Sequence, residues 1–206
     1  MTNPDIDPDR FVIQQASPRG FTQACVREGD GGVPLLCVHG WPETKRIFWK
    51  VIEPLAALGF DVIVPDLRGF GDSGLGPDNF GDTVTQSNDL YALVHDHLGI
   101  DKVVLMGGDF GGPIIQDLAM RHPEWCDRMV LFNSPLPYLT DRMTGMNSRP
   151  PFGRESSDYY MRQALEPDAL AAELDTPDHG FSLVICCTSE TRDAPFYSRK
   201  NTKSRG

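Results

Sequence analysis

The stretch Val103-Val104-Leu105-Met106-Gly107-Gly108-Asp109-Phe110-Gly111-Gly112 decides the fold of this 206-residue chain. Its first four residues are apolar and two are β-branched, which predicts a buried strand of a parallel sheet. Small residues surround Asp109, and an apolar-periodic helix is expected from Pro113. Glycines suit such a sharp turn because they lack a Cβ and leave room where helix and strand nearly touch. The sequence therefore predicts a strand, a tight turn and a helix, with Asp109 at the apex.

Asp109 has a structural and a chemical interpretation. An aspartate in front of a helix is a favoured N-cap, which is the structural alternative. The preceding strand, the glycines and the upstream pair His39-Gly40 favour a nucleophile at the turn, a nucleophile elbow. A carboxylate in that place attacks an sp³ carbon that bears a leaving group, and an ester of Asp109 forms. Water must then attack the carbonyl of that ester.

The rest of the N-terminal part alternates between short apolar strands and amphipathic helices. Strands are expected at residues 11–16, 22–28, 34–38, 61–65, 103–106 and 128–132, and helices at 44–58, 83–98 and 113–121. The first two strands are expected to form a hairpin. This alternation predicts an α/β fold with a doubly wound, mostly parallel sheet, whose active site lies at the carboxyl ends of the strands.

Composition and charge argue against several classes of protein. A net charge of −10 disfavours nucleic acid and anionic membrane surfaces as partners. No apolar run is long enough to cross a membrane, and the N-terminus lacks the features of a signal peptide. Five cysteines without framework spacing suit a reducing compartment, so a cytoplasmic location is expected. Cys, His and Asp form no metal-binding pattern, and the sequence indicates no oligomeric state.

Three parts of the chain are expected from these patterns. Residues 1–134 hold the N-terminal part of the core, and residues 135–179 read as a partial helical lid, or cap, punctuated by prolines. Residues 180–206 differ in charge from the rest and are expected to be a divergent, disordered tail.

The motif His39-Gly40-Trp41-Pro42-Glu43 follows the strand expected at 34–38. The backbone amides of Trp41 and Phe110 are expected to form an oxyanion hole that faces Asp109. Pro42 permits a cis peptide bond in this turn. We interpret His39 as a loop histidine that hydrogen-bonds its neighbours rather than as a catalytic group.

These motifs resemble the α/β-hydrolase superfamily, and most of all its epoxide hydrolase and haloalkane dehalogenase branch. The resemblance rests on His39-Gly-Trp-Pro-Glu43, Asp66-Leu-Arg-Gly-Phe-Gly-Asp-Ser-Gly74 and the turn around Asp109, and covers about residues 10 to 178. It implies an α/β-hydrolase fold, an Asp109 nucleophile, a small apolar epoxide or haloalkane as substrate, and no cofactor. Dehalogenases typically carry tryptophan after the nucleophile, whereas Phe110 has no ring N–H for a halide. Epoxide hydrolase therefore leads, and haloalkane dehalogenase is the alternative.

The resemblance also implies groups that assist the reaction. Lid tyrosines of the family aid the departure of the epoxide oxygen, and Tyr159 and Tyr160 are the candidates here, with lid packing as their structural alternative. The acid and the histidine that complete the second step follow the lid in this family, and neither is visible in this sequence. The fold is therefore expected to be incomplete at the C-terminus, without full turnover. A non-catalytic truncated fragment is a further alternative.

Overall fold

The computed structural model describes residues 9–29, 31–78, 80–134 and 169. The chain divides into two compact units, Met1–Tyr138 and Leu139–Gly206. All the strands and helices below lie in the first unit. The expected lid and tail fall outside the described residues, apart from Ala169, which is helical. The boundaries expected after residues 134 and 179 therefore remain predictions.

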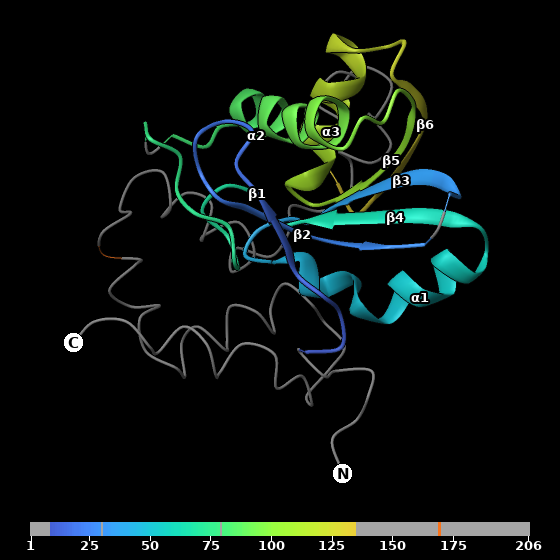
Figure 1. The fold of residues 1–206 in the computed structure, drawn as a ribbon. Coiled ribbons are helices and arrows are strands. Elements are labelled where there is room, and N and C mark those ends of the chain that lie inside the picture. Colours follow the sequence, from blue (N-terminus) through green and yellow to red (C-terminus); the bar gives the residue numbers. More distant parts are fainter. Residues whose placement is uncertain (1–8, 30, 79, 135–168, 170–206) are drawn as a thin grey trace, which may run out of the picture. The chain divides into compact units, whose positions relative to one another are not determined.

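One sheet of six strands runs through the described part of the first unit (Figure 1). Its strands are β1 (Gln14–Ala16), β2 (Gln23–Glu28), β3 (Val33–Val38), β4 (Phe60–Pro65), β5 (Val103–Gly108) and β6 (Cys126–Phe132), in the spatial order β1-β2-β4-β3-β5-β6. β3 is parallel to β4 and β5, and β5 is parallel to β6, whereas β2 is antiparallel to β1 and β4. The predicted mostly parallel sheet with its leading hairpin is confirmed.

The first strand is shorter than expected because Phe11 leaves the sheet. Its ring packs edge-on against Trp49, with the ring centroids 5.1 Å apart, and its side chain is buried. The apolar pattern of residues 11–16 thus reflects burial against a helix as well as pairing in a sheet.

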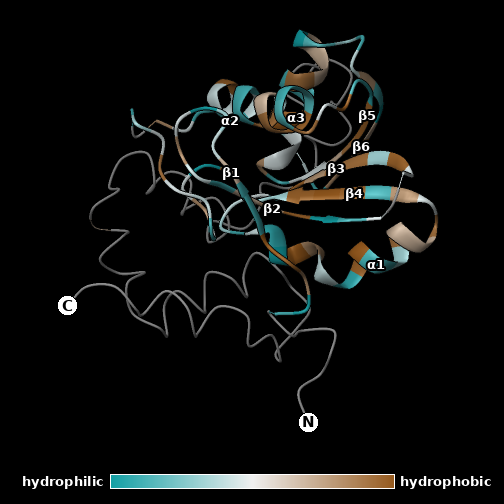
Figure 2. Ribbon diagram, viewed as in Figure 1, coloured by the Kyte–Doolittle hydropathy of each residue, from teal (hydrophilic) through white to brown (hydrophobic). Residues whose placement is uncertain are grey.

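Helices cover both faces of the sheet. A short 3-10 helix (Lys45–Phe48) leads into α1 (Trp49–Ala57), which lies on the opposite side of the sheet from α2 (Thr83–Tyr91) and α3 (Gly111–Arg121) (Figure 1). Two buried apolar clusters result, one on each face, and Figure 2 shows the hydrophobic residues gathered along the strands. Burial of apolar surface on both faces is what the strand sequences predict. Within the described residues, no helix is long and apolar enough to cross a membrane.

The single helix expected over residues 83–98 is two kinds of helix in the structure. α2 ends at Tyr91 and continues as a π-helix (Ala92–His97), whose wider turn is closed by the amide of Leu98 on the carbonyl of Leu93 at 3.0 Å. The three consecutive residues Ala92, Leu93 and Val94 are buried there. A pattern of 3.6 residues per turn does not place three neighbours on one buried face, so the sequence did not indicate this insertion.

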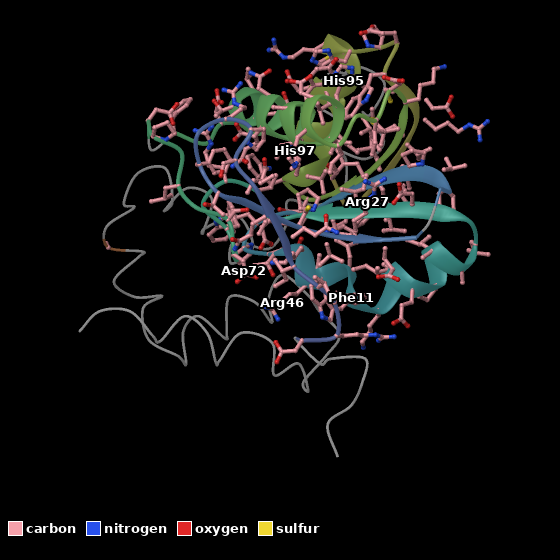
Figure 3. The ribbon with its side chains drawn as sticks, viewed as in Figure 1. Phe11, Arg27, Arg46, Asp72, His95 and His97 are labelled. Atoms are coloured by element: carbon pink, nitrogen blue, oxygen red, sulfur yellow. The ribbon has the colours of Figure 1, made fainter. Side chains whose placement is uncertain are left out.

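The loops that follow β3 and β4 are joined by a buried ion pair. Asp66 is fully buried at the end of β4 and accepts hydrogen bonds from the backbone amides of Lys45 and Asp72, both at 2.7 Å. The ammonium group of Lys45, itself fully buried, pairs with Asp66 and with Asp72, the latter at 2.6 Å. Figure 3 shows Arg46 beside Asp72, and their ion pair spans 3.6 Å. The loop after β3 is thus held against the end of β4.

We expect Lys45→Ala to lower the free energy of unfolding by about 3–5 kcal/mol, since it leaves the buried Asp66 carboxylate without its cation. Urea unfolding at neutral pH measures the change. Lys50→Ala is the matched control, because Lys50 is exposed on α1. Equal stability of the two variants would contradict the role given to Lys45.

Candidate active site

Asp109 occupies a strained turn between β5 and α3. Its φ angle is +47°, in the left-handed region that non-glycine residues rarely adopt. The N-cap of α3 is Phe110, whose own side chain makes no capping hydrogen bond. The N-cap interpretation of Asp109 is therefore wrong, and its carboxylate is left for other contacts.

Glycines permit the close contacts around this turn. A Cβ added to Gly111 would lie 2.7 Å from the carbonyl oxygen of His39. A Cβ added to Gly40 would lie 2.6 Å from the Oδ1 atom of Asp109. Both distances are shorter than any real side chain accepts, so the loop after β3 can touch the turn only where glycine stands.

Two backbone amides hold one oxygen of the Asp109 carboxylate. Oδ1 accepts a hydrogen bond from the amide of Trp41 at 2.8 Å and from the amide of Phe110 at 2.6 Å. Bonds of this kind to a carboxylate are short and strong because the acceptor is charged. No hydrogen bond from the described residues reaches Oδ2. The structure thus brings Asp109, Trp41 and Phe110 together, and the bond between Trp41 and Pro42 is cis. Their action as an oxyanion hole remains a prediction.

The end of β6 supports the turn from behind. The amide of Asp109 donates to the carbonyl of Asn133 at 3.0 Å, and the hydroxyl of Ser134 donates to the carbonyl of Asp109 at 3.0 Å. The sequence assigned no role to Asn133 and Ser134, because neither is a carboxylate. The structure shows that they fix the backbone of Asp109. Neither side chain has a carboxyl group that could serve as the acid of the second step.

His39 is buried and uses both ring nitrogens within the loops. Its Nε2 accepts a hydrogen bond from the amide of Leu67 at 3.0 Å, so Nδ1 carries the hydrogen and donates to the carbonyl of Gly40 at 2.9 Å. Burial lowers the pKa of His39 to about 4, against an opposing contribution from the Gly40 carbonyl. A neutral imidazole engaged on both sides agrees with the interpretation of His39 as a loop histidine.

We expect His39 to stay neutral in the folded chain down to about pH 4. The unfolded chain, with an ordinary pKa near 6.5, takes up the proton first as the pH falls. Stability from His39 is therefore full above pH 6.5 and declines by up to about 3 kcal/mol between pH 6.5 and pH 4. Urea unfolding at several pH values measures the slope, and His39→Gln is expected to flatten it. An unchanged slope in that variant would rule this out.

Glu43 places a second carboxylate beside the nucleophile candidate. Its Oε2 accepts a hydrogen bond from the amide of Gly40 at 2.7 Å. Burial raises the pKa of Glu43, the Gly40 amide opposes this rise, and the charge of Asp109 adds to it. The sequence contained Glu43 as part of a motif but assigned it no function. The signal was its position three residues after Gly40, close enough to bond back within one turn.

Replacing Asp109 with asparagine is expected to lower the pKa of Glu43, because it removes the negative charge that opposes ionisation of Glu43. Burial remains, so the shift reverses only in part. Carboxyl ¹³C resonances followed against pH give the value. Asp127→Asn, on exposed β6, is the matched control and should leave the pKa of Glu43 unchanged. A rise, or no change, in Asp109→Asn would show that the two carboxylates do not interact.

The structure places no further tyrosine or histidine of the described residues, apart from His39, in the hydrogen-bonded site around Asp109. Tyr159 and Tyr160 lie outside the described residues. His95 and His122 stack on the ring of Tyr91, with centroids 4.5 and 3.7 Å apart, between the helices on the α2 side of the sheet. Figure 3 shows His95 away from Asp72 and the loops after β3 and β4. In the described part of the chain, no three His, Cys, Asp or Glu side chains gather to hold a metal ion.

The sequence that forms these strands and turns matches a known family. A model of the "alpha/beta hydrolase fold" family matches residues 33–183, most of the chain. This chain belongs to the α/β-hydrolase fold family. The superfamily and the fold expected from the sequence motifs are thereby confirmed.

Epoxide hydrolases are prominent among the similar proteins. A soluble epoxide hydrolase of Corynebacterium sp. strain C12 is 37% identical over 119 residues, which cover 58% of this chain and 40% of that protein. An epoxide hydrolase of Caballeronia sordidicola is 29% identical over 152 residues, or 73% of this chain and 45% of that protein. The chain spans about half the length of the curated relatives it matches.

Solved structures give the same result. The epoxide hydrolase CorEH without ligand superposes with a TM-score of 0.56 at 31% identity, over 68% of this chain and 53% of that one. A variant of the Vigna radiata epoxide hydrolase gives a TM-score of 0.64 at 26% identity, over 81% of this chain and 52% of that one. The described sheet is therefore of the α/β-hydrolase type.

Proposed function

We propose that this chain carries the nucleophilic half of an epoxide hydrolase site, with Asp109 as the attacking group. The observation that carries the proposal is the difference between the two oxygens of its carboxylate. Two amides hold Oδ1, and no described residue bonds to Oδ2. A carboxylate held in this way presents one oxygen in a fixed direction. The epoxide hydrolases among its relatives support an epoxide as the substrate class, and the resemblance of the motifs implies a small apolar one.

The first step transfers the epoxide carbon to Asp109. An electron pair of Oδ2 forms a bond to the carbon while the ring C–O bond breaks, and the ring oxygen takes up a proton. Oδ1 becomes the carbonyl oxygen of the new ester and keeps its bonds to Trp41 and Phe110. We assign the donation of this proton to the hydroxyl of Tyr159 or Tyr160, as the resemblance implies.

The second step needs a water molecule at the ester carbonyl. Attack would place negative charge on Oδ1, where the amides of Trp41 and Phe110 stabilise it as an oxyanion hole. A base must also take a proton from the water. His39 is committed to Leu67 and Gly40, so it is not that base. We propose that the ester of Asp109 accumulates on this chain instead of turning over.

Incubation with a simple aryl epoxide such as styrene oxide tests this function. We expect a lasting mass increase equal to one epoxide per chain, mapped to the peptide that contains Asp109. Asp109→Ala should lose the adduct, and Asp127→Ala, on exposed β6, should keep it.

Four outcomes would contradict this proposal in different ways. Repeated turnover would overturn the accumulation of the ester. Absence of an adduct in a chain that melts cooperatively would overturn the function, and absence of a cooperative transition would favour a non-catalytic fragment. Halide release from a haloalkane would favour the dehalogenase alternative, although the side chain of Phe110 offers no N–H for a halide.

A further inference from the structure

The peptide group between Gly40 and Trp41 is held from both of its sides. Its carbonyl accepts hydrogen bonds from Nδ1 of His39 at 2.9 Å and from the amide of Glu43 at 3.2 Å. Its N–H, which belongs to Trp41, donates to Oδ1 of Asp109 at 2.8 Å. The carbonyl and the N–H of a trans peptide point in opposite directions within one plane. Bonds that fix the carbonyl of Gly40 therefore also set the direction of the Trp41 N–H.

Gly40 needs such outside support more than another residue would. It must be glycine because Asp109 lies where a Cβ would be, as the 2.6 Å approach to Oδ1 shows. A glycine backbone, however, has more conformational freedom than that of any other residue, so nothing within Gly40 itself fixes the orientation of the next peptide. The requirement for close approach thus creates a requirement for external hydrogen bonds.

Glu43 meets this requirement at both polar groups of Gly40. Its side-chain Oε2 accepts from the amide of Gly40 at 2.7 Å, while its own amide donates to the carbonyl of Gly40 at 3.2 Å. This reciprocal pair closes one turn of the loop, and the side-chain bond is strengthened because the acceptor is charged. His39 bonds only to the carbonyl of Gly40, whereas Glu43 bonds to both its carbonyl and its amide. Glu43 is therefore the residue that restrains Gly40 at both of its polar groups.

We propose that Glu43 is a positioning residue of the Asp109 site, which fixes Gly40 and thereby directs the Trp41 amide at Oδ1 of Asp109. The effect of Glu43 on reaction rate rests on the function proposed above. Its effect on the Trp41 amide does not, and this separates the two ideas experimentally.

Amide hydrogen exchange, followed by ¹⁵N NMR on the full chain, tests the positioning directly. In Glu43→Ala the backbone bond from the amide of Glu43 remains, but the side-chain bond to the amide of Gly40 is lost. The Trp41 amide should then exchange at least about tenfold faster, since the loosened peptide turns away from Asp109 more often. Glu43→Gln keeps a side-chain oxygen acceptor and should restore most of the protection. Glu124→Ala, an exposed glutamate after α3, is the matched control and should exchange like the unmutated chain.

The rate of adduct formation with styrene oxide is the second measurement. Glu43→Ala should react at least about tenfold more slowly, because a less firmly held Oδ1 leaves Oδ2 without a fixed direction towards the epoxide carbon. Glu43→Gln should recover most of this rate. If Glu43 only stabilised the fold, the Ala and Gln variants would react at the same rate once both are compared at equal folded fraction. Unchanged Trp41 exchange in a folded Glu43→Ala chain would overturn the proposal.

Two further outcomes remain decisive. If Glu43→Ala does not fold, the amide proton of Gly40 in the unmutated chain must shift as the Glu43 carboxyl titrates, and an unshifted resonance would overturn the inference. If the unmutated chain forms no adduct, the proposed function fails, and Trp41 exchange alone decides the role of Glu43.

Discussion

The two hydrogen bonds from Trp41 and Phe110 to Oδ1 of Asp109 are the contacts on which the geometry of this site depends. They join the loop after β3 to the turn between β5 and α3, which is distant from that loop in sequence. An aspartate whose backbone adopts the left-handed conformation costs on the order of 1–3 kcal/mol, and contacts with the surrounding structure must offset this cost. The bonds to Asn133 and Ser134 help to do so, because they fix the backbone of Asp109 from the other side. The turn is thus held through its carboxylate in front and its backbone behind.

The buried Lys45–Asp66 pair has a different character. Removing two charges from water costs several kcal/mol per ion, and their attraction recovers this only with good geometry and additional hydrogen bonds. Asp66 has those bonds, from the backbone amides of Lys45 and Asp72. The network is therefore better understood as specifying where the loop after β3 lies than as adding stability. It ends at Lys45, two residues beyond Glu43, so the segment that carries the Trp41 amide is anchored on β3 at one end and on Asp66 at the other.

The strands, their mostly parallel arrangement and the turn at Asp109 could be predicted from sequence because each depends on local pattern. Val103 to Met106 form a continuous apolar run, and the glycines around Asp109 mark a close approach wherever they occur. The pairing of His39-Gly40 with this turn followed from a general rule, that active sites lie at the carboxyl ends of parallel strands.

What the sequence did not reveal depends on contacts between distant residues. A lysine six residues after His39 gives no sign that it will be fully buried, because its partner Asp66 follows β4 in a distant part of the sequence. The departure of Phe11 from the first strand depends on Trp49 in the same way. The π-helix at Ala92–His97 is a third case, since its wider turn follows from packing three neighbouring side chains into one core.

The closeness of Glu43 to Asp109 connects the electrostatics of the loop with the proposed chemistry. Two like charges near each other oppose ionisation, and the raised pKa of Glu43 reflects the charge of Asp109 as well as burial. In the proposed first step, attack by Oδ2 would convert the Asp109 carboxylate into a neutral ester, while the new negative charge would develop on the epoxide oxygen and be neutralised there by a proton. The repulsion between the two carboxylates exists in the free chain and disappears in the ester. A carboxylate at position 43 therefore restrains the loop by its hydrogen bond and, through its charge, favours the state in which Asp109 has reacted.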